Sequence, residues 1–155
     1  MANVATVTII GAKETIAKLD ALDKKVRRKV VSAAMRAGAK VIVARAKANA
    51  PVASGKLKKA INVRVAKFIG SRKKKRGEIA INAQIGKGNF KGKTFYGAFQ
   101  EFGWKSGRRV KKGKTDNRRQ IQGKHFMETA GKQGASEAVN VIMNTIRTGI
   151  EEAAK

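Results

Sequence analysis

The side chains that could carry out catalysis are few in this 155-residue chain. It has one histidine, His125, no cysteine, and ten acidic residues scattered without the paired spacing of a glycosidase or a metal site. A lone histidine is more often structural than catalytic, and no pattern here orients a base toward a nucleophile. The segment Gly86-Lys87-Gly88 lacks the spacing of a phosphate-binding loop. We therefore predict no catalytic, metal-binding or cofactor-binding residues and no small-molecule substrate.

The chemistry that the sequence does offer is positive charge. Lys and Arg number 36 against 10 Asp and Glu, a formal net charge of +26. Self-repulsion of this size costs stability, so an anionic partner is expected: nucleic acid, an acidic membrane surface, or acidic faces of other protein subunits. Two segments, 72–76 and 105–124, concentrate the cations. The residues expected to face DNA or an acidic partner are Arg72, Lys73, Lys74, Lys75, Arg76, Arg108, Arg109, Lys111, Lys112, Arg118 and Arg119.

A single basic run is usually a solvated turn, but two runs and the large net charge together favour a functional role. If several identical subunits pointed these segments into a shared channel, they would hold the phosphates of passing DNA without reading its sequence. The same cations could instead contact acidic neighbouring proteins. Helix-turn-helix spacing and zinc ligands are missing, so base readout is disfavoured.

Aromatic residues gather in residues 95–104, which include the chain's only Tyr and only Trp. We favour packing of these rings against the helices over stacking on nucleic-acid bases. Glu101 lies between aromatic neighbours in a very basic chain. Because an unpaired buried carboxylate is costly, we expect Glu101 to pair with a Lys or Arg of its own or an adjacent subunit.

Hydrophobic periodicity supplies the elements that must position these groups. β-branched residues over 4–10 predict a strand, and apolar residues three or four apart predict a short helix near 13–22 and a long one near 23–49. Asp20 or Asp23 could cap the second helix, and Pro51 ends it.

The second half of the chain predicts strands followed by a helix. Alternating apolar residues over 61–65 and 79–85 predict a β-hairpin, with a basic tip near 70–77. The aromatic segment reads as a strand, and a C-terminal helix begins at Phe126. Its expected inward stripe is Ala138, Val139, Ile142, Ile146 and Ile150, despite Gly131, Gly134 and Gly149.

We therefore predict one α+β domain over residues 1–155, in which a small antiparallel sheet with a basic-tipped hairpin packs against a long N-terminal helix and a C-terminal helix. Flexible loops or arms are expected near 70–77, 86–93 and 105–124. The first residues lack a secretory pattern and no run approaches 18 apolar residues, so no membrane partner is expected.

Three landmarks in a fixed order resemble a family of siphophage neck and tail-completion proteins, which join the head to a long non-contractile tail. They are the Ala-Pro turn and Ser-Gly of residues 47–57, Tyr96 followed by Phe99 to Gly103, and the Phe126-Met127 helix start. Trp104, His125 and the long basic arm depart from the family pattern.

The resemblance implies a non-enzymatic minor tail or head–tail connector protein, made in the host cytoplasm and placed in the virion at the head–tail junction. It implies a homo-oligomeric ring, expected to be a hexamer, in contact with neck, tail-terminator or tail-tube proteins and with DNA passing through its channel. The residues expected at the subunit interface are Tyr96, Phe99, Glu101, Phe102, Trp104 and Phe126.

Two other functions are consistent with parts of the sequence. A small basic nucleic-acid-binding protein, ribosome-associated or of the nucleoid, would use the +26 charge as its main feature. A toxin-like nuclease is disfavoured because no catalytic constellation is present. Ring formation separates the connector from the nucleic-acid-binding protein, and metal-dependent DNA cleavage would identify a nuclease.

Overall fold

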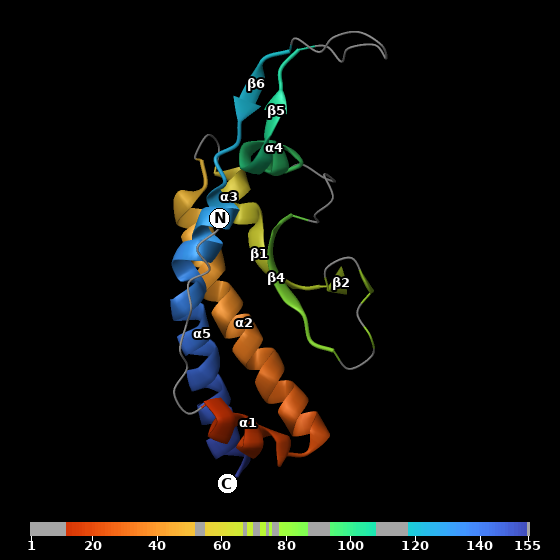
Figure 1. Cartoon of the computed structure of the whole chain (residues 1–155), viewed down its shortest axis with the longest axis vertical. Coiled ribbons are helices and arrows are strands. Elements are labelled where there is room, and N and C mark those ends of the chain that lie inside the picture. The colour runs from red at the N-terminus through yellow and green to blue at the C-terminus, as the bar shows by residue number, and fades with distance from the viewer. Residues whose placement is uncertain are drawn as a thin grey trace.

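Two long antiparallel helices form the body of the protein (Figure 1). The computed structural model describes residues 12–51, 55–66, 68–69, 72–73, 75, 78–86, 94–107 and 118–154. Helix α2 spans Lys24–Asn49 and helix α5 spans Phe126–Ala153, while the shorter α1, Ala12–Asp20, lies at the base of the pair. The helices predicted near 13–22, near 23–49 and from residue 126 are thus confirmed. The strand predicted over 4–10 lies outside the described residues.

The ends of α2 follow from local chemistry. The Asp23 carboxylate accepts a hydrogen bond from the backbone N–H of Lys25 at 2.8 Å, so Asp23, of the two candidates, is the N-cap. At the other end, Ala50 has extended backbone angles, φ −67° and ψ 136°, because the following Pro51 disfavours helical geometry.

Glycines set how closely α2 and α5 approach. A Cβ atom at Gly38 would lie 2.5 Å from Cγ1 of Ile142, and one at Gly149 would lie 2.8 Å from Cγ1 of Val30. Gly134 similarly faces Ile42. From the sequence, Gly134 and Gly149 were expected only to destabilise the C-terminal helix. The structure shows that they leave space for side chains of the partner helix α2.

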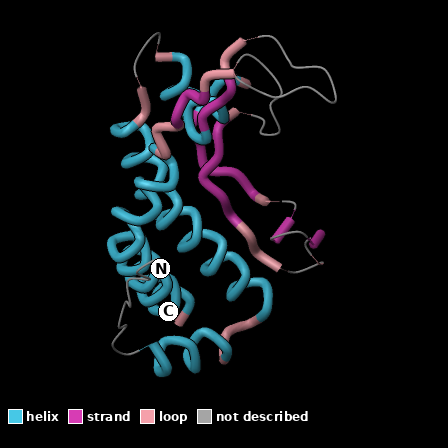
Figure 2. The backbone as a smooth tube through the Cα atoms, turned by 45° about the horizontal axis from the view of Figure 1, so that its top comes forward, coloured by secondary structure: helices cyan, strands magenta, loops and turns pink. Residues whose placement is uncertain are grey.

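A two-stranded sheet lies along one side of the helical body (Figure 2). Strand β1, Ile61–Val65, pairs antiparallel with β4, Ile81–Ile85, with Ile61 opposite Ile85. The hairpin predicted from alternating apolar residues is confirmed. Short helix α3, Lys56–Ala60, leads into β1 from Gly55, whose φ of +68° favours glycine.

The connection from β1 to β4 contains two short paired strands, β2 at Phe68–Ile69 and β3 at Arg72–Lys73. Most of the predicted basic tip, and residues 87–93 of the Gly-rich loop, lie outside the described residues.

The aromatic segment is helical, and the predicted strand there is wrong. Helix α4 spans Tyr96–Phe102, and its buried positions, Gly97 and Glu101, are four residues apart on one helical face. Strand β5, Gly103–Lys105, then pairs antiparallel with β6, Gln120–Gln122. The ends of the predicted 105–124 arm are therefore a hairpin rather than loop, while residues 108–117 lie outside the described residues.

The core lies where α2, α3, β1 and the first turns of α5 meet. Among the described residues, Phe126 and Ile61 are the largest side chains that are fully buried. The remaining core cluster is Val43, Ala46, Ala50, Leu57 and Ala130. This is the predicted α+β arrangement. None of the described helices has the length and apolar character that a membrane crossing requires.

Candidate functional site

Four large apolar side chains are exposed at one end of the molecule. They belong to α4 and its flanks: Phe95 is 51% exposed, Phe99 38%, Phe102 71% and Trp104 37%. The ring of Phe99 contacts both Phe95 and Trp104 edge-on, with centroids 6.0 and 6.5 Å apart. We call these four residues the aromatic patch. All four side chains stay at the surface instead of entering the core.

Helix α4 turns these rings outward because of what its inner face contacts. A Cβ atom at Gly97 would lie 2.9 Å from Cδ1 of Leu57 and 3.0 Å from Cγ2 of Ile85, so this face of α4 lies directly on the core. Tyr96 is half-buried and packs against the core cluster. The expectation that the rings pack against the helical body therefore holds for Tyr96 and fails for the patch.

Glu101 is buried, with 5% of its surface exposed, and among the described residues its hydrogen-bond partners are backbone groups and not a cation. Its two carboxylate oxygens accept hydrogen bonds from the backbone N–H groups of Met127, at 2.9 Å, and Glu128, at 3.0 Å. These N–H groups belong to the first turn of α5, where four donors lack intrahelical partners and the helix dipole favours negative charge. The predicted pairing with Lys or Arg is corrected: Glu101 caps α5 from a distant part of the chain.

The β5–β6 hairpin is joined tightly to α4 and α5 at its root. The backbone N–H of Lys124 donates to the carbonyl of Gln100 at 2.7 Å, and that of His125 donates to the carbonyl of Glu101 at 3.1 Å. Gly103, at φ +81°, and Gly123 pass so close to the opposite backbone that no side chain fits at either position. Beyond this root the hairpin projects away from the body (Figure 1).

His125 takes part in a small exposed ion network. Its Nδ1 lies 3.2 Å from Oε2 of Glu128, whose Oε1 accepts a hydrogen bond from Nζ of Lys132 at 2.7 Å. The hydrogen bond and charge of Lys132, with a smaller effect of His125, lower the pKa of Glu128 below its ordinary 4.5. Within the described part of the chain, no group of three His, Asp or Glu residues is placed to hold a metal ion.

The residues expected at a subunit interface divide into two groups. Phe99, Phe102 and Trp104 lie on the aromatic patch, and Tyr96 lies beside it. Glu101 and Phe126 are 5% and 2% exposed, so their side chains lie inside the chain and do not reach its surface.

The basic residues are described only in part. Lys73, Lys75 and Arg119 are exposed and Arg118 is half-buried, with Arg118 and Arg119 directly before β6. For Arg72 the structure describes only the strand. Lys74, Arg76, Arg108, Arg109, Lys111 and Lys112 lie outside the described residues.

Residues 13–103 match the model of a protein family described as HK97-gp10-like, a bacteriophage tail component. The match covers more than half of the 155-residue chain. The chain belongs to the HK97-gp10-like family. This HK97-gp10-like protein shows no significant similarity to a curated protein or to a solved structure.

The matched region runs from α1 through α4 and ends at the first residue of β5. It includes three of the four patch residues. Membership supports a structural role in a phage tail, a place in the virion and contacts with other tail proteins.

Proposed function

We propose that this HK97-gp10-like protein is a neck or tail-completion component that joins the phage head to its tail as a homo-oligomeric ring. Six subunits is the number that the family resemblance implies. The aromatic patch is the observation that carries the proposal, because α4 and its flanks expose four large rings in a chain whose core is built mainly from smaller residues. Aromatic side chains are enriched at the centres of protein interfaces.

A closed ring needs two different surfaces on each subunit, so that the patch of one copy meets another face of the next. The β5–β6 hairpin follows α4 directly and projects away from the body (Figure 1), and its strand β5 contains Trp104 of the patch, so the hairpin is suited to reach that neighbour. A two-stranded hairpin is marginally stable alone, so such a contact would also stabilise the hairpin. In this arrangement, Arg72–Arg76 and the basic residues of 108–119 face either the DNA channel or an acidic neck, terminator or tube protein.

The patch itself supports protein contact over base stacking. Phe99 already contacts both Phe95 and Trp104 edge-on, so these three rings form one apolar surface. Single-strand-binding proteins instead interleave separate aromatic side chains with cations along a groove. The second candidate, a small nucleic-acid-binding protein, is favoured by the +26 charge.

The double substitution Phe102→Ala and Trp104→Ala tests the interface. We expect the variant to stay monomeric in native mass spectrometry and electron micrographs, and to fail to join heads to tails in a complementation assay. Its circular dichroism spectrum should match that of the parent, with a lower melting temperature that comes mainly from Trp104, because Phe102 is 71% exposed whereas Trp104 is 37% exposed and contacts Phe99. Ile16→Ala is the control, since Ile16 is 56% exposed on α1, away from the patch.

Normal rings and normal head–tail joining by the double variant would refute the proposal. A parent protein that forms no ring and binds DNA as a monomer would favour the second candidate.

A further inference from the structure

Helix α2 presents a row of exposed side chains that is separate from the aromatic patch and the hairpin. Exposed positions recur every three or four residues along one face of the helix. This row, the basic ridge, consists of Lys25, Lys29, Ala33, Arg36, Lys40, Ala44 and Ala48. At a rise of 1.5 Å per residue, its four cations span about 22 Å.

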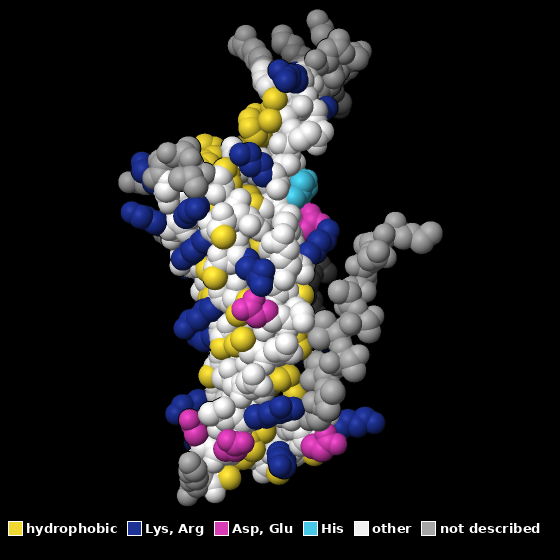
Figure 3. All heavy atoms as spheres, turned by 90° about the vertical axis from the view of Figure 1, so that its left-hand side faces the viewer, with side chains coloured by type: hydrophobic (Ala, Val, Ile, Leu, Met, Phe, Trp, Pro, Cys, Tyr) yellow, Lys and Arg dark blue, Asp and Glu magenta, His cyan; other side chains and the backbone are white. Residues whose placement is uncertain are grey.

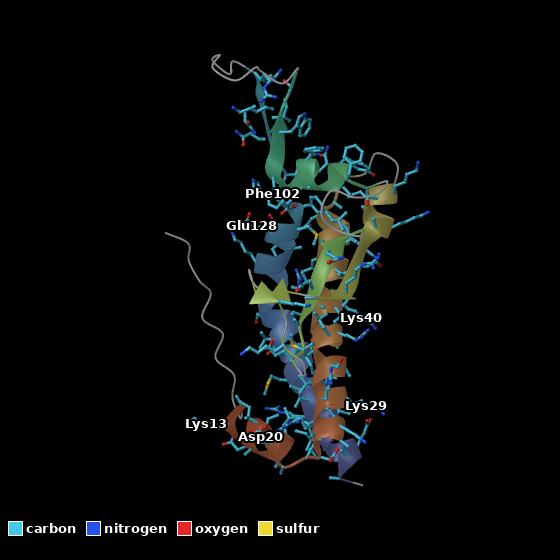
Figure 4. All side chains as sticks on the ribbon, turned by 90° about the vertical axis from the view of Figure 1, so that its right-hand side faces the viewer. Lys13, Asp20, Lys29, Lys40, Phe102 and Glu128 are labelled. Carbon is cyan, nitrogen blue, oxygen red and sulfur yellow. The ribbon has the colours of Figure 1, made fainter. Side chains whose placement is uncertain are left out.

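All seven ridge residues are exposed, and two of them, Lys29 and Ala33, border a hollow whose other side is formed by the last turns of α5. One flank of the helix, with Val30, Ala34 and Gly38, is buried, and its glycine contacts α5. Another flank, with Val43, joins the core under β1. Figure 4 shows Lys29 and Lys40 projecting from the same side of α2, and Figure 3 shows Lys and Arg side chains following one long edge of the molecule.

Within the described part of the chain, no acidic side chain forms an ion pair with the ridge, although Asp20 borders the same hollow as Lys25 and Glu152 the same hollow as Lys29. The sequence has no Asp or Glu between Asp23 and Glu78. The two ion pairs that α2 makes among described residues involve Arg27 and Arg45, which are outside the ridge. No ridge cation has a carboxylate partner among those residues.

The ridge also differs from an ordinary solvated helix face. Lys25 and Lys29, like Arg36 and Lys40, are like charges four residues apart, which repel. Helix α5 of the same chain instead pairs Glu128 with Lys132 at this spacing. The repulsion on α2 is relieved when a polyanion lies along it.

The chemistry of the ridge favours nucleic acid over an acidic protein. Protein interfaces have an apolar centre with a polar rim, whereas the only apolar groups of the ridge are the methyl groups of its three alanines. Lys and Arg on a smooth surface suit phosphates that recur along a strand. The ridge has no aromatic ring for stacking and no Asn or Gln for reading adenine. We propose that the basic ridge of α2 binds the sugar–phosphate backbone of double-stranded DNA without sequence preference.

Charge-matched double substitutions test this proposal. Lys29→Gln with Lys40→Gln removes two ridge cations, and Lys18→Gln with Lys132→Gln removes two exposed cations from α1 and α5. Binding of a labelled duplex of random sequence is measured by fluorescence anisotropy from roughly 50 to 200 mM salt. Affinity falls with salt, and each phosphate contact contributes about 0.9 to the steepness of log affinity against log salt. The ridge variant, which lacks two cations, should therefore show a slope that is less steep by up to about 1.8.

The control variant should keep the parent slope, and AT-rich and GC-rich duplexes should bind all variants equally. Equal slopes for the ridge and control variants would overturn the proposal, as would a parent protein that binds no duplex. If the ridge variant loses contact with an acidic tail protein but keeps the parent slope, the ridge is a protein interface and the proposal is wrong. Native mass spectrometry of the same variants reports ring formation separately, so failure of the ring and failure of the ridge are distinguishable.

Discussion

The helical body and the aromatic end of this protein use apolar side chains in opposite ways. Where α2 meets α5, small residues let the two backbones come close, namely Gly38, Gly134 and Gly149. At the end of the molecule, Phe102 and Trp104 stay exposed. Close packing of small residues stabilises the chain itself. Exposed rings add little to that stability, so their bulk is available for contact with another molecule.

The largest expected effect is a difference in the free energy of unfolding between two substitutions, one in the helical body and one at the aromatic end. Phe126→Ala removes a ring that is 2% exposed and should lower the free energy of unfolding by about 3–5 kcal/mol. Phe102→Ala removes a ring that is 71% exposed and should change it by less than about 0.5 kcal/mol. Urea denaturation followed by circular dichroism measures both. Similar losses from the two variants would mean that the aromatic end is part of the stabilising core.

An intermediate effect is expected at Glu101, which belongs to α4 but caps α5. Glu101→Ala leaves the N–H groups of Met127 and Glu128 without their acceptor and should cost about 1–3 kcal/mol of unfolding free energy. Glu101→Gln keeps one acceptor oxygen and should cost less. Denaturation midpoints of the two variants measure the difference, and an unchanged midpoint for Glu101→Ala would show that the cap contributes nothing.

The smallest effect concerns the exposed network at the start of α5. Because Lys132, and to a lesser degree His125, lower the pKa of Glu128, the ionised carboxylate stabilises the fold. This contribution is fully present above the ordinary pKa of 4.5 and is lost as pH falls through the lowered value. Lys132→Gln should therefore reduce the difference in stability between about pH 6 and pH 3. Parallel pH curves for parent and variant would contradict this.

Regular periodicity made much of the fold predictable. The three- and four-residue spacing of apolar residues located α2 and α5, and Ile61 and Ile85 sit at the ends of two alternating runs that pair in register. The N-cap at Asp23 and the end of α2 before Pro51 depend only on neighbouring residues, so they could be predicted from the local sequence.

The aromatic end was harder to predict because its determinants are not local. Phe95, Phe99 and Phe102 have helical spacing, but periodicity alone does not say whether a face is inside or outside. The small Gly97 decides this by lying against Leu57 and Ile85.

Two other features also depend on tertiary packing. The role of Glu101 depends on N–H groups 26 and 27 residues away along the chain, which no sequence pattern indicates. The basic ridge is visible as a spacing of cations, but packing decides which face of α2 stays free.

The Glu101 cap has a mechanical consequence. Strand β5 begins two residues after Glu101, and the carboxylate of Glu101 holds the first turn of α5. A force that pulls the hairpin away from the body therefore acts on α5 by two routes, the backbone of residues 123–125 and the two hydrogen bonds of Glu101. Because α5 runs from the root of the hairpin to the end of the molecule where α1 lies (Figure 1), tension on the hairpin acts on the longest described helix at its first turn.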